Sequence, residues 1–267
     1  MKKTVAKKKK WPKVLLVILI IIGGLVGFTC YNASKNMKVM NRTLDAGMET
    51  ISKYAKLTPI DAGEYKQIKM YGLLKFDVDQ YDVEDIGNLS VMKVNMGFMQ
   101  MVSYIITPYK KDMPMLSMDF MYIFGKRKAY AEFYDLVSDT ADSEYVKVLD
   151  SIKKYDISYS DFKDIETDPA WYDEYLTVVL HKEAKRADDE RVEKMFCDAI
   201  SCYMEAAKEL KPLSEAERLN KLAITQKYCD TLVEKGGVST DVFKKQLGKE
   251  KTKDFFDKVL FGTEQYR

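Results

Sequence analysis

One carboxylic acid stands out among the residues whose types could do chemistry. Asp119 lies within the apolar run Met115–Met121, which has the composition of a β-strand. Alternation along a strand places Asp119 on the same face as Met115, Ser117 and Met121. A carboxyl group enclosed by such neighbours has a raised pKa and can donate a proton near neutral pH. The run therefore predicts a buried or half-buried acid.

The residues alone leave two interpretations of this acid open. In the second, Asp119 faces solvent or forms an ion pair with Lys126 or Arg127, as structural carboxylates often do. The sequence has one histidine, His181, which we expect at the end of a short strand in a structural role. A single histidine does not supply a histidine-rich zinc site, and the chain has no GxGxxG, GKS/T or GxSxG motif. Conventional enzyme signatures are therefore missing.

The cysteines give no sign of a metal centre or a disulfide framework. Cys197, Cys202 and Cys229 are odd in number and have no CxxC spacing. We expect them to be buried residues of helices, and we expect no metal site.

The N-terminal region joins a basic segment to a long apolar run. Residues 1–13 carry seven lysines and no acid, so the rest of the 267-residue chain has a formal charge of −5 against +2 overall. A mildly acidic body argues against nucleic-acid binding. Residues 14–31 are uncharged and approach the ~20 apolar residues that cross a bilayer. We expect a transmembrane helix here rather than a cleaved signal peptide, since no small-residue cleavage motif follows.

The lysine count also predicts an orientation in the membrane. By the positive-inside rule the tail 1–13 is cytoplasmic, and the body beyond residue 31 is extracytoplasmic. The expected organisation is a basic tail over 1–13, a transmembrane helix over 14–31, a juxtamembrane helix over 32–57 and one domain over 58–267.

Within the body, a sheet precedes a group of helices. Short β-prone runs separated by turn residues between 64 and 137 predict a meandering antiparallel sheet. Helical spacing returns later, with one apolar face from Val192 to Tyr203. A second helix is expected between a Ser214–Glu217 capping box and Gly236. Its predicted buried face consists of Leu219, Leu222, Gln226, Cys229 and Leu232. This order indicates an α+β fold.

Two stretches of this body have a recognisable pattern. The first runs from Pro108 through a turn at Asp112-Met113-Pro114 to Asp119. The second, residues 212–261, contains Tyr228-Cys229, Leu247-Gly248 and Val259-Leu260-Phe261 in order. Together they resemble the ferredoxin-dependent bilin reductases, most closely the phycocyanobilin:ferredoxin oxidoreductase branch. The resemblance covers about residues 60–262.

This resemblance implies a three-layer α/β/α sandwich, with a central antiparallel sheet flanked by helices and a linear tetrapyrrole between the sheet and the C-terminal helices. It implies no permanently bound metal or flavin, and electrons that arrive singly from a ferredoxin. Asp119 is then the catalytic proton donor.

The resemblance also assigns substrate-binding positions. Ser103 and Met92 stand where the family has a histidine and a glutamate, and Ser117 and Met121 share the face of the acid. A second family carboxylate or amide falls near Gly236.

The expected function is reduction of an open-chain tetrapyrrole, biliverdin or a related bilin, with protonation by Asp119. Ferredoxin, flavodoxin or a membrane redox carrier would donate electrons. The missing histidine and glutamate keep open a non-catalytic, membrane-anchored bilin-binding protein as the alternative, and a tethered interaction domain as a third.

The position of an electron donor is a separate expectation. A soluble ferredoxin would require the domain on the cytoplasmic side, against the orientation that the lysines predict. Its docking patch is expected at Lys110-Lys111, residues 126–128 or residues 182–186.

Overall fold

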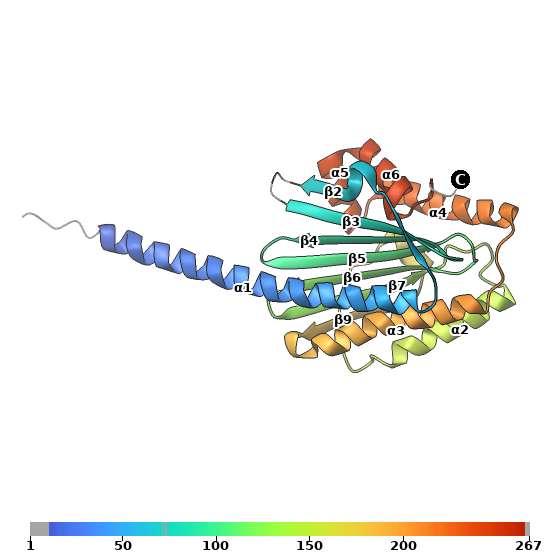
Figure 1. Cartoon of the computed structure of the whole chain (residues 1–267), viewed down its shortest axis with the longest axis horizontal. Helices are drawn as coiled ribbons and strands as arrows, with labels where there is room; N and C mark the ends of the chain where they lie inside the picture. The colour runs from blue at the N-terminus through green and yellow to red at the C-terminus, as the bar shows by residue number, and fades with distance from the viewer. Residues whose placement is uncertain (1–10, 71, 73, 265–267) are drawn as a thin grey trace, which may run out of the picture.

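The structure, a computed structural model, describes residues 11–70, 72 and 74–264 (Figure 1). The larger part of the predicted basic tail, residues 1–10, lies outside this range. The helices and strands, in chain order, are α1 (Trp11–Ser52), β1 (Leu57–Ile60), η1 (Gly63–Lys66), β2 (Gln67–Met70), β3 (Leu74–Val83), β4 (Gly87–Asn95), β5 (Met99–Pro108), β6 (Met115–Ile123), β7 (Lys126–Tyr134), α2 (Ser143–Ile157), β8 (Lys163–Asp164), η2 (Trp171–Tyr175), β9 (Leu176–Lys185), η3 (Arg186–Asp188), α3 (Asp189–Lys208), α4 (Glu215–Lys235), α5 (Val238–Leu247), α6 (Lys249–Phe255) and the π-helical turn η4 (Phe256–Leu260).

The described strands form one nine-stranded sheet in the order β1-β3-β4-β5-β6-β7-β9-β8, with β2 paired to β3. Every pairing is antiparallel, and β3 to β7 form a meander. Helices α1, α2 and α3 cover one face, and α4, α5 and α6 cover the other (Figure 1). The predicted α+β class and three-layer arrangement are confirmed.

The N-terminal helix differs from the prediction. A transmembrane helix over 14–31 and a separate juxtamembrane helix over 32–57 were expected, whereas α1 is one helix from Trp11 to Ser52. No proline interrupts the chain between residues 13 and 58, so nothing breaks the backbone ladder at residue 31. The helix also ends before 57, because Leu57 begins β1.

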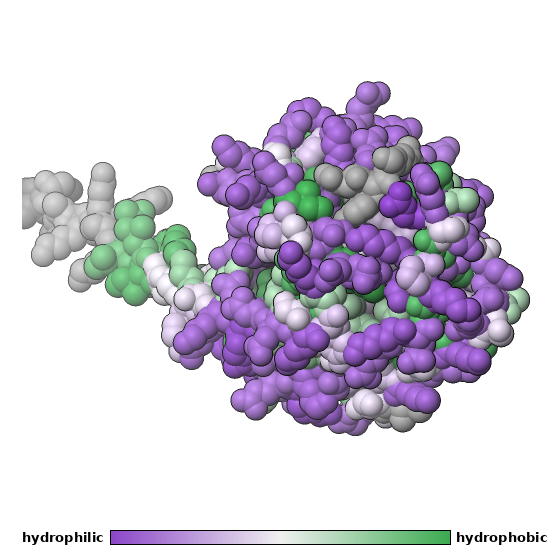
Figure 2. All heavy atoms as spheres, turned by 45° about the vertical axis from the view of Figure 1, so that its right-hand side comes forward, coloured by the Kyte–Doolittle hydropathy of each residue, from purple (hydrophilic) through white to green (hydrophobic). Residues whose placement is uncertain are grey.

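The two halves of α1 have different surroundings. Side chains from Leu15 to Phe28 are almost all exposed, and this stretch projects from a body whose visible surface is mostly polar (Figure 2). By length and apolar composition the helix could cross a membrane, a test that an N-terminal signal sequence also passes. From Asn32 onward α1 packs on the sheet and on α3. Gly47 permits this close approach, since a Cβ there would lie 2.2 Å from Phe196 Cε1.

Helix α4 has the predicted ends but a rotated buried face. The Ser214–Glu217 capping box and the termination at Gly236, with φ of 87°, are as predicted. Leu219, predicted to be buried, is 50% exposed. The residues that α4 buries are Lys221, Leu222, Thr225, Tyr228, Cys229 and Val233.

The predicted face of α4 was wrong at Leu219, because the helix is turned so that it buries Lys221. Lys221 Nζ donates to Met113 O at 2.7 Å and to Leu136 O, and lies 3.2 Å from Asp112 Oδ1. These acceptors replace water around the ammonium group, although burial still lowers the pKa of Lys221 to about 8. The lysine thus ties α4 to the turn that precedes β6.

Candidate active site

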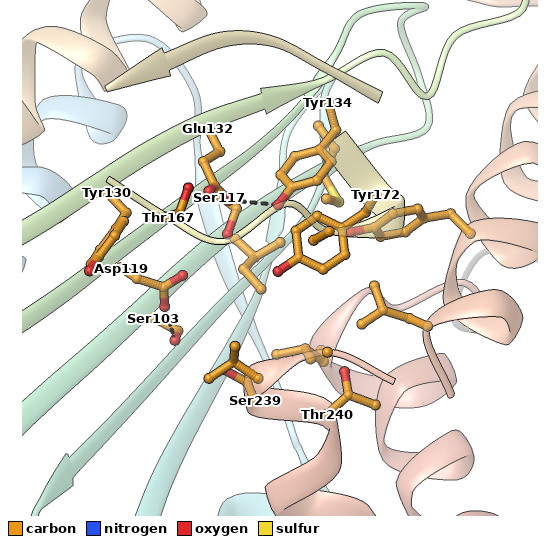
Figure 3. Close-up of a pocket in the computed structure, with 18 of the residues that line it drawn as sticks. Ser103, Ser117, Asp119, Tyr130, Glu132, Tyr134, Thr167, Tyr172, Ser239 and Thr240 are labelled. Atoms are coloured by element: carbon orange, nitrogen blue, oxygen red, sulfur yellow. Dashed lines mark hydrogen bonds between the residues drawn. The ribbon is translucent and has the colours of Figure 1, made fainter. Parts of the chain in front are cut away.

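A cavity of about 460 Å³ lies between the sheet and the C-terminal helices, a size that suits a small organic ligand. Its floor is the face of β4 to β9 that α1 does not cover, and its roof is formed by α4, α5 and η4. Polar side chains point into it from the sheet, while Ser239 and Thr240 face them from α5 (Figure 3). The floor residues are Met92, Met101, Ser103, Ile105, Met115, Ser117, Asp119, Met121, Tyr130, Glu132, Tyr134 and His181.

Strand register places five of these residues in one row across the sheet. Met92 pairs with Ser103, Ser103 with Asp119, Asp119 with Tyr130, and Tyr130 with His181. Residues directly opposite in antiparallel strands point to the same face, so the row forms a continuous strip of the cavity floor. The structure thus brings together the predicted residues Asp119, Ser103 and Met92, and Ser117 and Met121 flank the acid along β6.

Asp119 lies half-buried at the centre of this row. The pKa of its carboxyl group is raised to about 6, because burial and, less strongly, the nearby Glu132 carboxyl outweigh the lowering effect of a hydrogen bond donated by the Ser103 hydroxyl. The competing interpretation, an ion pair with Lys126 or Arg127, is wrong for Arg127, whose guanidinium pairs with Asp189 on the other face of the sheet. Asp119 is therefore a group that can hold a proton near neutral pH.

Replacing Ser103 by Ala should raise the pKa of Asp119. The Ser103 hydroxyl donates to the carboxylate and so favours its charged form, and alanine removes that donor. Carbon NMR titration of the Asp119 carboxyl carbon measures the shift. Ser117→Ala is the matched control, because Ser117 is on the same face and its hydroxyl is not the donor to Asp119. A pKa that falls in Ser103→Ala would contradict the assigned bond direction.

A second proton-carrying group was missed by the sequence analysis. His181 Nε2 lies 2.7 Å from Glu132 Oε1, and the Tyr134 hydroxyl donates to Glu132 Oε2 at 2.6 Å. The expected position of His181 at a strand end is wrong, because β9 continues to Lys185 and His181 lies inside it. The His181 ring also packs edge-on against Tyr130 at 5.0 Å. Alternation from Tyr134 to Glu132 and Tyr130 was the available signal for Glu132.

The other walls of the cavity come from two connecting segments. The segment before β9 contributes Thr167, Asp168 and Tyr172, and Trp171 Nε1 donates to Gly236 O at 2.8 Å. Gly236, predicted near a second carboxylate position, ends α4 and does not line the cavity, whereas residues 237–240 do.

Several of the basic groups expected in a docking patch make contacts within the protein. Lys111 Nζ donates to Ala207 O at 2.8 Å and to Leu210 O at 2.6 Å. Lys182 Nζ is 2.5 Å from Asp164 Oδ1 and is 6% exposed as a residue. Arg127 is buried beside Asp189, and Lys110 lies 3.4 Å from Asp82. These groups contribute to folding, and Lys126, Lys128 and Lys185 are left on the surface.

Within the described residues, no group of three or more His, Cys, Asp or Glu side chains is arranged to hold a metal ion. Cys197 and Cys202 are partly buried in α3, and Cys229 is buried in α4. Burial raises the pKa of all three thiols, which suits packing residues rather than thiolates.

Comparison with known proteins identifies this arrangement. The arrangement is an α/β/α sandwich with a cavity between its antiparallel sheet and its C-terminal helices. Residues 66–262 match the model of the ferredoxin-dependent bilin reductase family, and the chain belongs to that family. A search of curated proteins finds no match.

A solved structure shares the fold. The chain is similar to selenomethionine phytochromobilin synthase from tomato, crystallised in complex with biliverdin, with a TM-score of 0.68 and 14% sequence identity. The match covers 85% of this chain and 83% of that chain.

Proposed function

We propose that the protein reduces an open-chain tetrapyrrole, biliverdin or a related bilin, bound in the cavity over the Asp119 row. The observation that carries this proposal is the half-buried Asp119 carboxyl, with its raised pKa, on the floor of a cavity of suitable size. The biliverdin complex of the tomato relative supports the substrate class. Asp119 donates the first proton.

Reduction of one double bond consumes two electrons and two protons, so a second proton source is needed. His181 and Glu132 share a hydrogen bond 2.7 Å long in the same cavity, next to Tyr130 in the row. We assign the second proton to this pair. Ser103 and Met92 stand where the family has a histidine and a glutamate, and neither side chain is a general acid. Because the His181–Glu132 pair can supply a proton instead, we favour reduction over pigment binding alone.

Electrons come singly from an external donor in this proposal. The family description names ferredoxin, and flavodoxin or a membrane redox carrier could serve in the same role. No permanently bound cofactor is invoked, because the row of side chains handles protons while the bilin itself accepts the electrons.

Anchoring in a membrane by residues 14–31 is part of the proposal. The exposed apolar length of α1 supports it. The lysine bias of the tail predicts an extracytoplasmic domain, whereas a soluble ferredoxin would require a cytoplasmic one. Protease protection in sealed vesicles, read with an antibody against the C-terminus, distinguishes the two orientations.

The experiment that tests the reaction is an anaerobic titration of the full chain in detergent with biliverdin, followed by reduced ferredoxin. We expect a bound complex whose absorption bleaches and gives a shifted product band. A complex that stays unchanged with ferredoxin, flavodoxin and a chemical one-electron donor alike would leave the alternative, a bilin-binding protein. No complex at all would overturn both functions.

A further inference from the structure

The contact between α1 and the folded body begins inside the apolar stretch of the helix. Phe28 stacks on Phe124 at the β6–β7 hairpin tip, with ring centroids 5.9 Å apart. Thr29 lies against Gly97 at the β4–β5 tip. Phe28 is three residues before Tyr31, where the uncharged run ends, and at 1.5 Å per residue this is ~5 Å along the helix. Both hairpin tips therefore lie level with the last turn of the apolar segment.

A polar network holds this geometry in place. Arg186 Nη2 donates to Asn32 Oδ1 at 2.7 Å and to Phe124 O at 2.9 Å. Asn36 Nδ2 donates to Gln100 Oε1 at 2.8 Å and to Phe124 O at 3.2 Å. Asn32 and Asn36 are buried, so the helix and the two hairpins form one rigid junction. A bilayer around residues 14–31 would meet the tips directly.

The tips of the β4–β5 and β6–β7 hairpins carry aromatic side chains, at least one of which is exposed. Phe98 is 53% exposed at the end of the β4–β5 hairpin, and Phe28, which stacks on Phe124, is 58% exposed on α1. Phe124 has a φ of 51°, an uncommon conformation for a bulky residue, and donors from three side chains bind its carbonyl oxygen. This aromatic residue is thus held at the tip despite its backbone cost. Phenylalanine is among the residues that interfacial segments bury at the boundary between headgroups and acyl chains.

Charge at the same end of the sheet fits a lipid surface. Lys126 and Lys185 are exposed and directly opposite each other in the β7–β9 pairing. Like charges in such a pair repel, and an anion between them removes the penalty. Phosphates of lipid headgroups would supply that anion at this height.

An apolar strip connects this end to the cavity. Met101 pairs with Met121 on the cavity floor, and the next pair on the same face toward the tips is Met99 with Ile123. All four are partly exposed. Asp119 is four residues from Ile123, which at ~3.3 Å per residue puts the acid roughly 13 Å from the β6–β7 tip.

We propose that this end of the domain rests in the headgroup region of the bilayer, with the hairpin-tip residues Phe98 and Phe124 in contact with lipid. The cavity then opens close to the membrane surface. The inference rests on the membrane anchoring proposed above, and it does not depend on the reaction.

The test uses the full chain in lipid nanodiscs whose phosphatidylcholine is brominated on the acyl chain close to the headgroup, a quencher of tryptophan fluorescence. Trp11→Phe removes the tryptophan that precedes the apolar run, and Trp171 remains as a reference at the far end of β9. Phe98→Trp is compared with Leu219→Trp, a site of similar exposure. Asn220 and Leu213, close to Leu219, bond to Ser138 and Lys110 at the opposite end of the sheet.

We expect brominated lipid to quench Phe98→Trp several-fold more than Leu219→Trp. Equal quenching at the two sites overturns the proposal, and so does failure of the chain to assemble into nanodiscs. Because no bilin is present, the result is separate from the reaction. Strong quenching with no turnover would contradict only the proposed function, and turnover with equal quenching would contradict only the lipid contact.

Discussion

Asp119→Asn is expected to slow bilin reduction by about 10²–10⁴-fold, the usual contribution of a positioned proton donor, and to leave biliverdin affinity nearly unchanged. Asparagine keeps the shape of the side chain and can still accept the hydrogen bond from Ser103, but it has no acidic proton to deliver. Stopped-flow absorption after mixing the biliverdin complex with reduced ferredoxin measures the rate, and a titration without donor measures affinity.

Asp135→Asn is the matched control for this variant. Burial raises the pKa of Asp135 to about 6 as well, but Asp135 lies near Lys221 and does not line the cavity. Its replacement should leave the rate within a few-fold of the parent. Equal losses of rate in the two variants would mean that replacing Asp119 slows the reaction by destabilising the fold. Full turnover in Asp119→Asn would show that Asp119 is not the proton donor.

The raised pKa of Asp119 also predicts how the stabilities of the parent protein and of Asp119→Asn depend on pH. The folded-state pKa, about 6, exceeds the ordinary aspartate value of 3.8, so the folded protein binds this proton more tightly than the unfolded chain does. Asp119 therefore lowers the free energy of unfolding as pH rises from about 4 to 6, by at most ~3 kcal/mol. Asp119→Asn should be the more stable protein at pH 7.5 and should lose that advantage at pH 4, as urea denaturation can show.

The second large effect is expected from Asp189→Ala, which should destabilise the folded body by roughly 3–5 kcal/mol. Arg127 is 1% exposed, and its guanidinium contacts both carboxylate oxygens of Asp189, at 2.6 and 3.1 Å. The same group lies 4.1 Å from the centre of the Tyr122 ring. Without Asp189 a buried cation would keep only backbone carbonyls as acceptors. Chemical denaturation of the domain followed by tyrosine fluorescence measures the loss.

Two further variants separate the ion pair from side-chain size. Asp161→Ala removes the carboxylate from an exposed pair with Arg191 at 2.8 Å, and because solvent screens that pair, the variant should lose far less stability than Asp189→Ala. The double variant Arg127→Met with Asp189→Leu replaces both charges by apolar groups and should recover much of the stability. If Asp189→Ala proves no worse than Asp161→Ala, the burial of the pair does not govern its strength.

The sequence predicted features that depend on local chemistry. The side on which Asp119 lies follows from alternation within β6, and the Ser214 cap of α4 follows from residues three positions apart. Glu132 and His181 could not be joined in the same way. They are 49 residues apart and meet only because β7 pairs with β9 in one register.

The rotated face of α4 and the unbroken α1 have similar explanations. Lys221 is buried because acceptors on the turn before β6 surround it, and no periodicity within α4 reveals those partners. In α1 the sequence changes from apolar to mixed near residue 31, which marks a change of surroundings rather than an end of the helix.

With the proposed membrane anchoring, the continuity of α1 determines how the domain could be released. A typical tethered domain hangs from an exposed linker, where a protease can cut and shed it intact. Here the apolar segment that we propose as the membrane anchor passes without a loop into the part of α1 that supplies Met40, Leu44 and Ile51 to the core. Cleavage after Asn32 would also remove parts of the junction with Arg186. A protease that releases the domain would thus have to unwind part of α1 before cutting it. A released form would keep its core only if the cut lay on the N-terminal side of Asn32.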